Sequence, residues 1–441
     1  MSIAIAETIQ ALQVVLQTVP VGTNLALLHL LWSILNGSFL SSRGAIFPGM
    51  QLTGFSEEES RRSWAALRYG VWRIEELIAA WRHDVLTTGR WQVQEYEGYR
   101  PVAADITAFW RPRLKGWTGR FFHGIANRLL LGVGLGLVVD VGQVDGQRLP
   151  LIRQIIHAPK EDNSQERLKS EILTWLGRHL AANEVAVFDA GAHIAEMQLA
   201  HVARYVVRMA SNCTARRSQL PDYQGGRPRA YGLLVRPLSR QRKGKEIAAT
   251  PADSETTFVY QDRTIRAQAW NDLVLPGHKV ADEPDTFNIL VFHDPLYRTP
   301  LVVGTNLAAA PETIFRLYLD RWPVEQVPLV AKQTLGLQRM FVFAPRSCER
   351  LPELALLAAN ILSYLAAILP AWPTGFWDRR PKKRPDGCGA SWRRRIFQLL
   401  PFLRGDFGKS ARRRHTCRRV WRPIDGEKGR IERLAYRFLP V

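Results

Sequence analysis

The chain has 441 residues, which is too long for one typical hydrophobic core and predicts two or three structural units. Its 60 Lys and Arg against 40 Asp and Glu give a net charge of +20, and its hydrophobic fraction of 46% argues against wholesale disorder. This charge excess indicates a polyanionic partner, with nucleic acid favoured over an anionic membrane surface. The 4 cysteines include no CxxC pair, so a zinc ribbon and a disulfide framework are not expected, and a reducing cytoplasm fits best.

Residues 1–98 predict a helical N-terminal domain. Ser56 followed by Glu59 is typical of a capping box ahead of a run with apolar residues every three or four positions. Two interpretations stay open for this domain: a plain helical bundle, or a domain that binds DNA ends. The first residues have no basic region and include Glu7, so we expect no signal peptide.

From residue 99 the pattern changes to strands with interspersed helices, which predicts an α/β fold. We expect strands at 101–110, 128–141, 147–156, 184–191 and 204–211, with helices at 164–183 and 193–202. Ser164 is available to cap the first of these helices. Three consecutive strands before a helix favour an antiparallel meander.

Residues 212–285 are rich in Arg, Pro and Gly and predict an inserted β-subdomain. The α/β pattern returns with strands at 286–294 and 300–306 and a helix that begins near Pro311. Residues 354–372 form 19 positions without a charge, long enough to span a bilayer, but small and polar interruptions favour a buried helix.

The last segment, 374–441, holds 20 Lys and Arg against 6 Asp and Glu, a local net charge of 20 − 6 = +14. It predicts a basic tail that binds phosphates without sequence preference. The expected domains are therefore 1–98, a catalytic domain in two parts (99–211 and 286–373), the insertion 212–285 and this tail.

The order of strands and helices, with acids on two strands, is that of an RNase H-like domain, a mixed sheet flanked by helices. Asp105 lies within the first predicted strand and Asp189 near the end of the fourth, and these strands neighbour each other in such a sheet. A third carboxylate from a later helix can complete a site for two Mg²⁺ ions, which serve phosphodiester transfer. Asp140 is the alternative to Asp105, but it would break the three-strand meander.

The segment YLDRWPVEQVPLVAK, residues 318–332, places polar residues on one face of a predicted helix. They are Tyr318, Arg321, Glu325 and Lys332. Asp320 points elsewhere around that helix, and we expect it to face solvent or pair with an Arg. Pro328 falls between Glu325 and Lys332, where its missing N–H predicts a kink.

These residues match Y-x2-R-x3-E-x6-K, and the segment resembles the signature of a large group of bacterial insertion-sequence DDE transposases. The contexts TNLAAAPETIFRLYLDRWPVEQ, KQTLGL, AADIT and VFDAGAH extend the resemblance over roughly residues 99–370. It implies an enzyme for cut-and-paste DNA transposition, with Asp105, Asp189 and Glu325 as ligands of two Mg²⁺ ions, for which Mn²⁺ can substitute. Tyr318, Arg321 and Lys332 would bind phosphates.

The resemblance also implies partners: terminal inverted repeats, target DNA and a second copy of the chain in a synaptic dimer. We expect a cytoplasmic, nucleoid-associated protein without membrane contact. Trp270 is the candidate to stack on an extruded base, and ordinary packing is the alternative role. Two other functions stay open, a decayed transposase that binds ends without cutting and a stand-alone RNase H-like nuclease.

Overall fold

The structure is a computed structural model that describes residues 3–111, 113–222, 229–242, 244–371, 373 and 382–385. The chain divides into two compact units, Met1–Gln398 and Leu399–Val441. The second unit lies outside the described residues, as does nearly all of the predicted basic tail. Every feature reported below belongs to the first unit.

The N-terminal region is helical, as predicted. Its helices are α1 (Ile3–Leu16), α2 (Thr23–Leu35), α3 (Ser38–Ser41), α4 (Ile46–Leu52), α5 (Glu57–Tyr69) and α6 (Ile74–Thr87). The capping box is confirmed, because the Ser56 side chain accepts from the Glu59 N–H while Glu59 accepts from the Ser56 N–H. This cap fixes the start of α5 at the residue that the sequence predicts.

The described strands form a large mixed sheet of 13 strands and a separate two-stranded sheet. They are β1 (Gln92–Val93), β2 (Arg100–Trp110), β3 (Arg120–His123), β4 (Arg128–Val144), β5 (Gln147–Ile156), β6 (Glu184–Phe188), β7 (Tyr205–Arg208), β8 (Ala215–Arg217), β9 (Leu234–Val235), β10 (Arg240–Arg242), β11 (Lys245–Ile247), β12 (Ser254–Tyr260), β13 (Arg263–Val274), β14 (Phe287–His293) and β15 (Leu301–Thr305). The remaining elements are α7 (Gln165–His179), α8 (Ile194–Leu199), η1 (Val280–Asp282), α9 (Pro311–Leu319), α10 (Pro323–Leu329), the π-helix η2 (Val330–Thr334) and α11 (Pro345–Ile368). The predicted α/β fold is confirmed, and Ser164 caps α7 as expected.

Strand pairing follows the order β5-β4-β2-β6-β7 through the first part of the sheet. The pairs β5–β4 and β4–β2 are antiparallel, which confirms the predicted meander, whereas β2–β6 and β6–β7 are parallel. The first and fourth predicted strands, β2 and β6, therefore lie side by side. The sheet continues from β7 through β15, β14 and β13 to β8 and β9.

The segment expected as an inserted β-subdomain contributes directly to this sheet. β13 pairs antiparallel with β14, and β12 and β8 pair with β13. Among its described strands, β10 and β11 form a separate two-stranded ladder. Hydrogen bonding thus runs without a break from the β15–β14 pair into the insertion.

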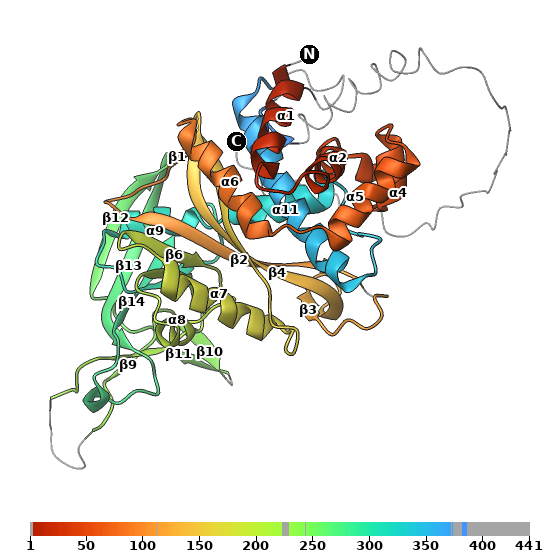
Figure 1. Ribbon diagram of the computed structural model, residues 1–441. Helices are drawn as coiled ribbons and strands as arrows, with labels where there is room; N and C mark the ends of the chain where they lie inside the picture. The colour runs from red at the N-terminus through yellow and green to blue at the C-terminus, as the bar shows by residue number, and fades with distance from the viewer. Residues whose placement is uncertain are drawn as a thin grey trace, which may run out of the picture. The chain divides into compact units, whose positions relative to one another are not determined.

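Helices cover both faces of the sheet (Figure 1). The alternation of side chains along β2 decides which helices meet which residues. Val102 and Ala104 belong to the core formed with α7 and α8, whereas Ala103 belongs to the core formed with α10, α11 and the N-terminal helices. On β6, Val187 shares the core of α9. Odd-numbered residues at the start of β2 therefore face the side of the sheet that carries α10.

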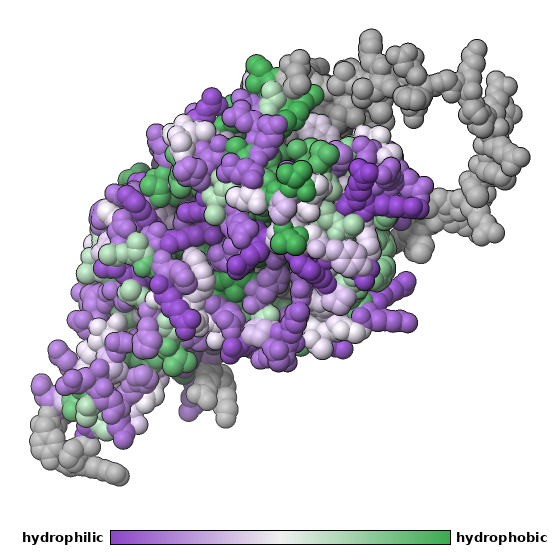
Figure 2. Space-filling model, viewed as in Figure 1, coloured by the Kyte–Doolittle hydropathy of each residue, from purple (hydrophilic) through white to green (hydrophobic). Residues whose placement is uncertain are grey.

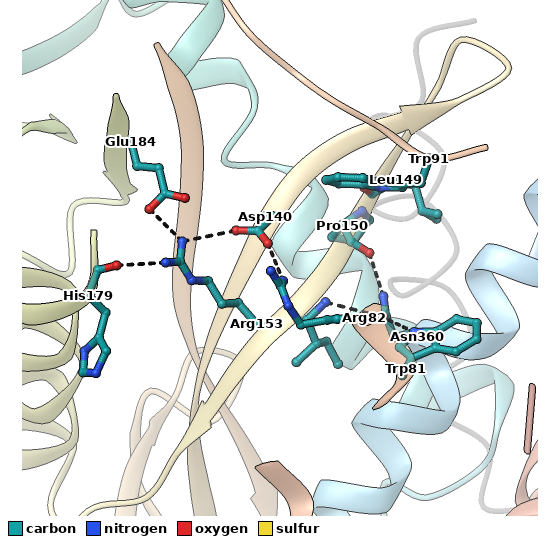
Figure 3. Close-up of polar contacts among 11 residues, drawn as sticks. Trp81, Arg82, Trp91, Asp140, Leu149, Pro150, Arg153, His179, Glu184 and Asn360 are labelled. Atoms are coloured by element: carbon teal, nitrogen blue, oxygen red, sulfur yellow. Dashed lines mark hydrogen bonds and ion pairs between the residues drawn. The ribbon is translucent and has the colours of Figure 1, made fainter. Parts of the chain in front are cut away.

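The long apolar helix α11 is the centre of the larger core. It is long and apolar enough to cross a membrane by length and composition, but 94% of its most apolar stretch is buried inside the fold. Asn360 explains its polar interruption, because it accepts from the Trp81 indole (3.1 Å) and donates to the Pro150 carbonyl (2.6 Å) (Figure 3). The predicted buried helix is thus confirmed, because α11 lies in the core of the fold. Hydrophilic residues dominate the face seen in Figure 2.

Candidate active site

Two acidic side chains meet where the parallel strands β2 and β6 stop pairing. The last registered pair is Ala103 with Val187. Asp105 lies two positions further along β2, on the face that carries α10, and Asp189 directly follows the end of β6 at Phe188, so both acids lie just beyond the paired part of the two strands. The structure therefore brings together two acids that lie 84 residues apart in the chain (189 − 105 = 84).

The third acid and its neighbours come from a broken helix, not from the single helical face that the sequence suggested. α9 ends at Leu319, residues 320–322 form a turn, and α10 begins with Pro323 at its first position. Proline suits this position because it has no N–H to leave unpaired and its φ angle is preset for a helix. Tyr318 therefore lies at the end of α9, Arg321 in the turn and Glu325 in the first turn of α10.

Arg321 links two of the three acids. Its Nη1 lies 2.6 Å from Glu325 Oε1 and 3.9 Å from Asp189 Oδ2. The Arg321 side chain is 9% exposed, and its Nε has no hydrogen-bond partner among the described residues. Burial by itself lowers the pKa of Arg321, but Glu325 and then Asp189 outweigh it, so the net pKa is raised. Arg321 is thus a permanently charged cation between two carboxylates.

The Asp105 carboxyl is perturbed by its burial. Burial raises the pKa of Asp105 to about 6, and the charges of Glu325 and Asp189 add to the rise. The Ile106 N–H donates to Asp105 Oδ1 (2.8 Å) and opposes it. Electrostatic coupling among three acids in one place is typical of a site that binds a cation.

Tyr318 and Arg208 complete the surroundings of Asp189. The Tyr318 hydroxyl donates to Asp189 Oδ1 at 3.4 Å, and the pKa of Tyr318 is raised by burial and by that carboxylate. Arg208, at the end of β7, lies 3.7 Å from the same oxygen. Arg208 was not predicted from the sequence. A cation that ends the strand beside β6 is the signal that could have identified it.

Lys332 faces into the protein. Its ammonium donates to Thr107 Oγ1 (2.7 Å) and lies 5.1 Å from the centre of the Phe109 ring and 5.9 Å from that of Trp110. Burial lowers the pKa of Lys332 to about 8, and Asp105 opposes that shift. Thr107 was missed in the sequence, although it lies two residues after Asp105 and therefore on the same face of β2.

Lys332 owes its position to a π-helical turn. The π-helix η2 follows α10 directly, and the Leu335 N–H donates to the Val330 carbonyl, five residues back. Pro328, buried within α10, has no N–H to donate to Val324. The predicted kink stays a prediction: Pro328 lies within α10, and the helix changes after Leu329 into a π-helical turn that contains Lys332 itself.

The structure places three other predicted residues outside this site. Trp270 is 1% exposed and its indole donates to the Thr250 and Pro251 carbonyls, so it packs in the core and does not present a ring to a base. Asp140 pairs with Arg82 and Arg153 (Figure 3), which leaves Asp105 as the acid of the site.

Asp320 is the third residue outside the site. It is fully buried, and it accepts from the Tyr96 hydroxyl and pairs with Arg148 Nε, each at 2.9 Å. The expected Arg partner is confirmed. This pair anchors the turn that carries Arg321.

The donor set of this site suits a hard divalent cation. Asp105, Asp189 and Glu325 supply carboxylate oxygens, the ligands that Mg²⁺ prefers. Within the described ranges, no group of three His, Cys, Asp or Glu side chains converges closely enough to hold a metal ion. Two of the three carboxylates instead face the Arg321 guanidinium, a cation of the chain itself. The protein itself therefore supplies a positive charge beside the Asp189 and Glu325 carboxylates.

Comparison with models of known protein families and with curated proteins gave no match for this chain.

Proposed function

We propose that this protein is a DDE-type DNA transposase with an RNase H-like catalytic core. The observation that carries the proposal is that Arg321 lies 2.6 Å from Glu325 and 3.9 Å from Asp189, while burial and then the charge of Glu325 raise the pKa of Asp105 just beyond the parallel pairing of β2 with β6. The strand order β5-β4-β2-β6-β7 supports the same core. The net charge of +20 suits a DNA substrate.

The proposed chemistry is phosphodiester hydrolysis followed by strand transfer. Asp105, Asp189 and Glu325 would hold Mg²⁺, which when bound supplies Lewis acidity at the attacking and leaving oxygens. Arg321 and Tyr318 orient the Asp189 and Glu325 carboxylates through the contacts given above. Water would attack the phosphorus at a transposon end, with cleavage of the bond to the 3′ oxygen. The freed 3′-hydroxyl would then attack the opposite strand, which closes that end as a hairpin and releases the flanking DNA. Water would open the hairpin, and the regenerated 3′-hydroxyl would attack the target DNA.

The functional state would be a homodimer that holds two terminal inverted repeats, with the N-terminal helices on the ends and the 374–441 tail on flanking phosphates. The protein would act in the cytoplasm at the nucleoid. Arg321, Tyr318 and Lys332 would contact DNA phosphates only after binding of the ends releases Arg321 from its two carboxylates and turns Lys332 out from Thr107.

The decisive experiment is cleavage of DNA that carries the two sequences flanking the reading frame, with Mg²⁺ and the full chain. We expect cleavage at the ends, and its loss in Asp105→Asn, Asp189→Asn and Glu325→Gln with end binding retained. Asp140→Asn is the matched control, because Asp140 is also an acid on a core strand but pairs with Arg82 and Arg153. Activity lost in Asp140→Asn and kept in Asp105→Asn would refute the assignment.

A decayed transposase is the second candidate, and Pro328 inside α10 is the observation that favours it. In that case the wild-type chain should bind the ends but leave them uncut with either Mg²⁺ or Mn²⁺. Cleavage without any preference for end sequences would instead indicate a stand-alone nuclease.

A further inference from the structure

We propose that the β3–β4 hairpin, residues 120–131, is an arm that inserts apolar side chains between DNA bases. Its partner would be duplex DNA beside the cleaved phosphate, so the inference rests on the function proposed above. The hairpin lies at the end of the long curved strand β4 (Figure 1).

The outer side of the hairpin is apolar and exposed. Phe122 is 50% exposed and Leu129 is 56% exposed, and the two are cross-strand partners. Ile125, in the turn between them, is 94% exposed. Each of these side chains leaves a large apolar surface in water, which is unfavourable unless a partner covers it. Together they form a compact apolar tip.

The base of the hairpin is held firmly. The Phe121 side chain is buried, and a Cβ on Gly134 would lie 2.0 Å from its ring, so the ring occupies the space that only glycine leaves. The Phe122 N–H donates to Gln165 Oε1 of α7 (3.1 Å), and the Trp117 indole donates to the Gly132 carbonyl (2.8 Å). A rigid base lets the tip push against a partner, because little conformational freedom is lost on contact.

The positive charge around the tip favours a polyanionic partner. Residues 106–139 contain no Asp or Glu but five Lys or Arg. These are Arg111, Arg113, Lys115, Arg120 and Arg128, of which all but Arg111 are exposed. Cations beside apolar side chains are the combination with which proteins grip phosphates and wedge apart base steps.

A chain of contacts connects the hairpin with the candidate active site. The last part of β2 leads from Asp105 to Trp110, and the Trp110 ring lies 5.1 Å from that of His123 in β3. The Lys332 ammonium lies 5.9 Å from the same Trp110 ring. DNA held at the candidate active site would therefore extend past Trp110 toward the hairpin. The wedge would open the duplex next to the bond to be cut, where a hairpin intermediate needs a distorted end.

The test uses full-length protein and an end duplex with 2-aminopurine beside the cleavage site. Wild-type protein should raise the fluorescence of this base on binding without Mg²⁺, because the base leaves its stack. The double variant Phe122→Ala/Ile125→Ala should lose most of this rise and cut the paired end about tenfold more slowly, since unstacking one step costs a few kcal/mol. A mismatch at that step should restore its cleavage rate.

The matched control is Val21→Ala/Val259→Ala, which removes apolar side chains that are 96% and 65% exposed on other elements. It should behave as wild type. An equal fluorescence rise in the hairpin variant and the wild type would overturn the wedge. So would a change in the variant's self-association without DNA, or loss of its binding to anionic vesicles. If the wild-type chain does not cleave the ends but still raises the fluorescence in a way that depends on Phe122 and Ile125, the proposed catalysis is refuted and the wedge is supported.

Discussion

The Arg321 guanidinium lies 2.6 Å from Glu325 and 3.9 Å from Asp189, so one buried cation holds two acids that come from different parts of the chain. The cation stabilises carboxylates that would otherwise repel each other and Asp105. Its removal should therefore affect folding as well as the proposed chemistry.

We expect Arg321→Met to lower the free energy of unfolding by about 1–2 kcal/mol, because Glu325 and Asp189 are partly solvated and lose only part of their stabilisation. Urea unfolding at pH 7 measures the change. The control is Arg316→Met, whose exposed pair with Glu312 should contribute at most about 0.5 kcal/mol. Equal effects of the two variants would show that Arg321 is not the main counter-charge of the acids.

Asp105→Asn should abolish end cleavage and yet stabilise the fold at neutral pH. The folded pKa of Asp105 is raised to about 6 from a usual value near 4, so the folded state binds this proton more tightly than the unfolded state. That contribution to stability is present below about pH 4 and is lost as the pH rises through about 6. The variant should therefore gain on the wild type across this window, by about 1–2 kcal/mol.

Unfolding curves from pH 4 to pH 7 for both proteins measure the Asp105 effect. Asp140→Asn serves as the contrast, since it leaves Arg82 without its acid and Arg153 with Glu184 alone, and should lower stability. A difference between wild type and Asp105→Asn that does not change with pH would contradict the burial of the Asp105 charge.

The stability difference between Lys332→Met and the wild type should change with pH in the direction opposite to that of Asp105→Asn, and over an alkaline range. The pKa of Lys332 is lowered to about 8, so between about pH 8 and 10.5 the unfolded state binds more protons than the folded state. Stability of the wild type therefore rises with pH through this window relative to the variant. We expect the variant's advantage at pH 7 to shrink by about 2–3 kcal/mol by pH 10.5. Thermal melts of both proteins, with the exposed Gln333→Met as control, check this.

Pro328→Leu tests whether the π-helical turn is adapted or damaged. A leucine restores the N–H that can donate to Val324 and removes a constraint next to η2. We expect a regular α-helix to turn Lys332 away from Thr107, so that end cleavage falls at nearly unchanged stability. Single-turnover cleavage and urea unfolding measure the two effects, with Pro323→Ala at the first position of α10 as control. A joint gain in cleavage and stability would mark the natural chain as a damaged transposase.

The sequence by itself determined the order of the elements and the positions of two of the acids. Strand alternation, helical spacing and the caps at Ser56 and Ser164 each depend on residues only a few positions apart. They can therefore be recognised in the amino-acid sequence. The predicted strand 147–156 coincides with β5. The parallel pairing of β2 and β6, expected from the order of strands, placed Asp105 next to Asp189.

The tertiary structure alone decided which polar residues face the site and which stabilise the core. Helical spacing could not show that α9 ends before Arg321, because that break depends on the buried pairing of Asp320 with Tyr96 and Arg148. These partners lie 224 (320 − 96) and 172 (320 − 148) residues away in the chain. Exposure of Trp270 could not be inferred either, since its burial follows from how β13 packs in the sheet. Interactions between distant segments require the positions of both partners, and local patterns specify only one of them.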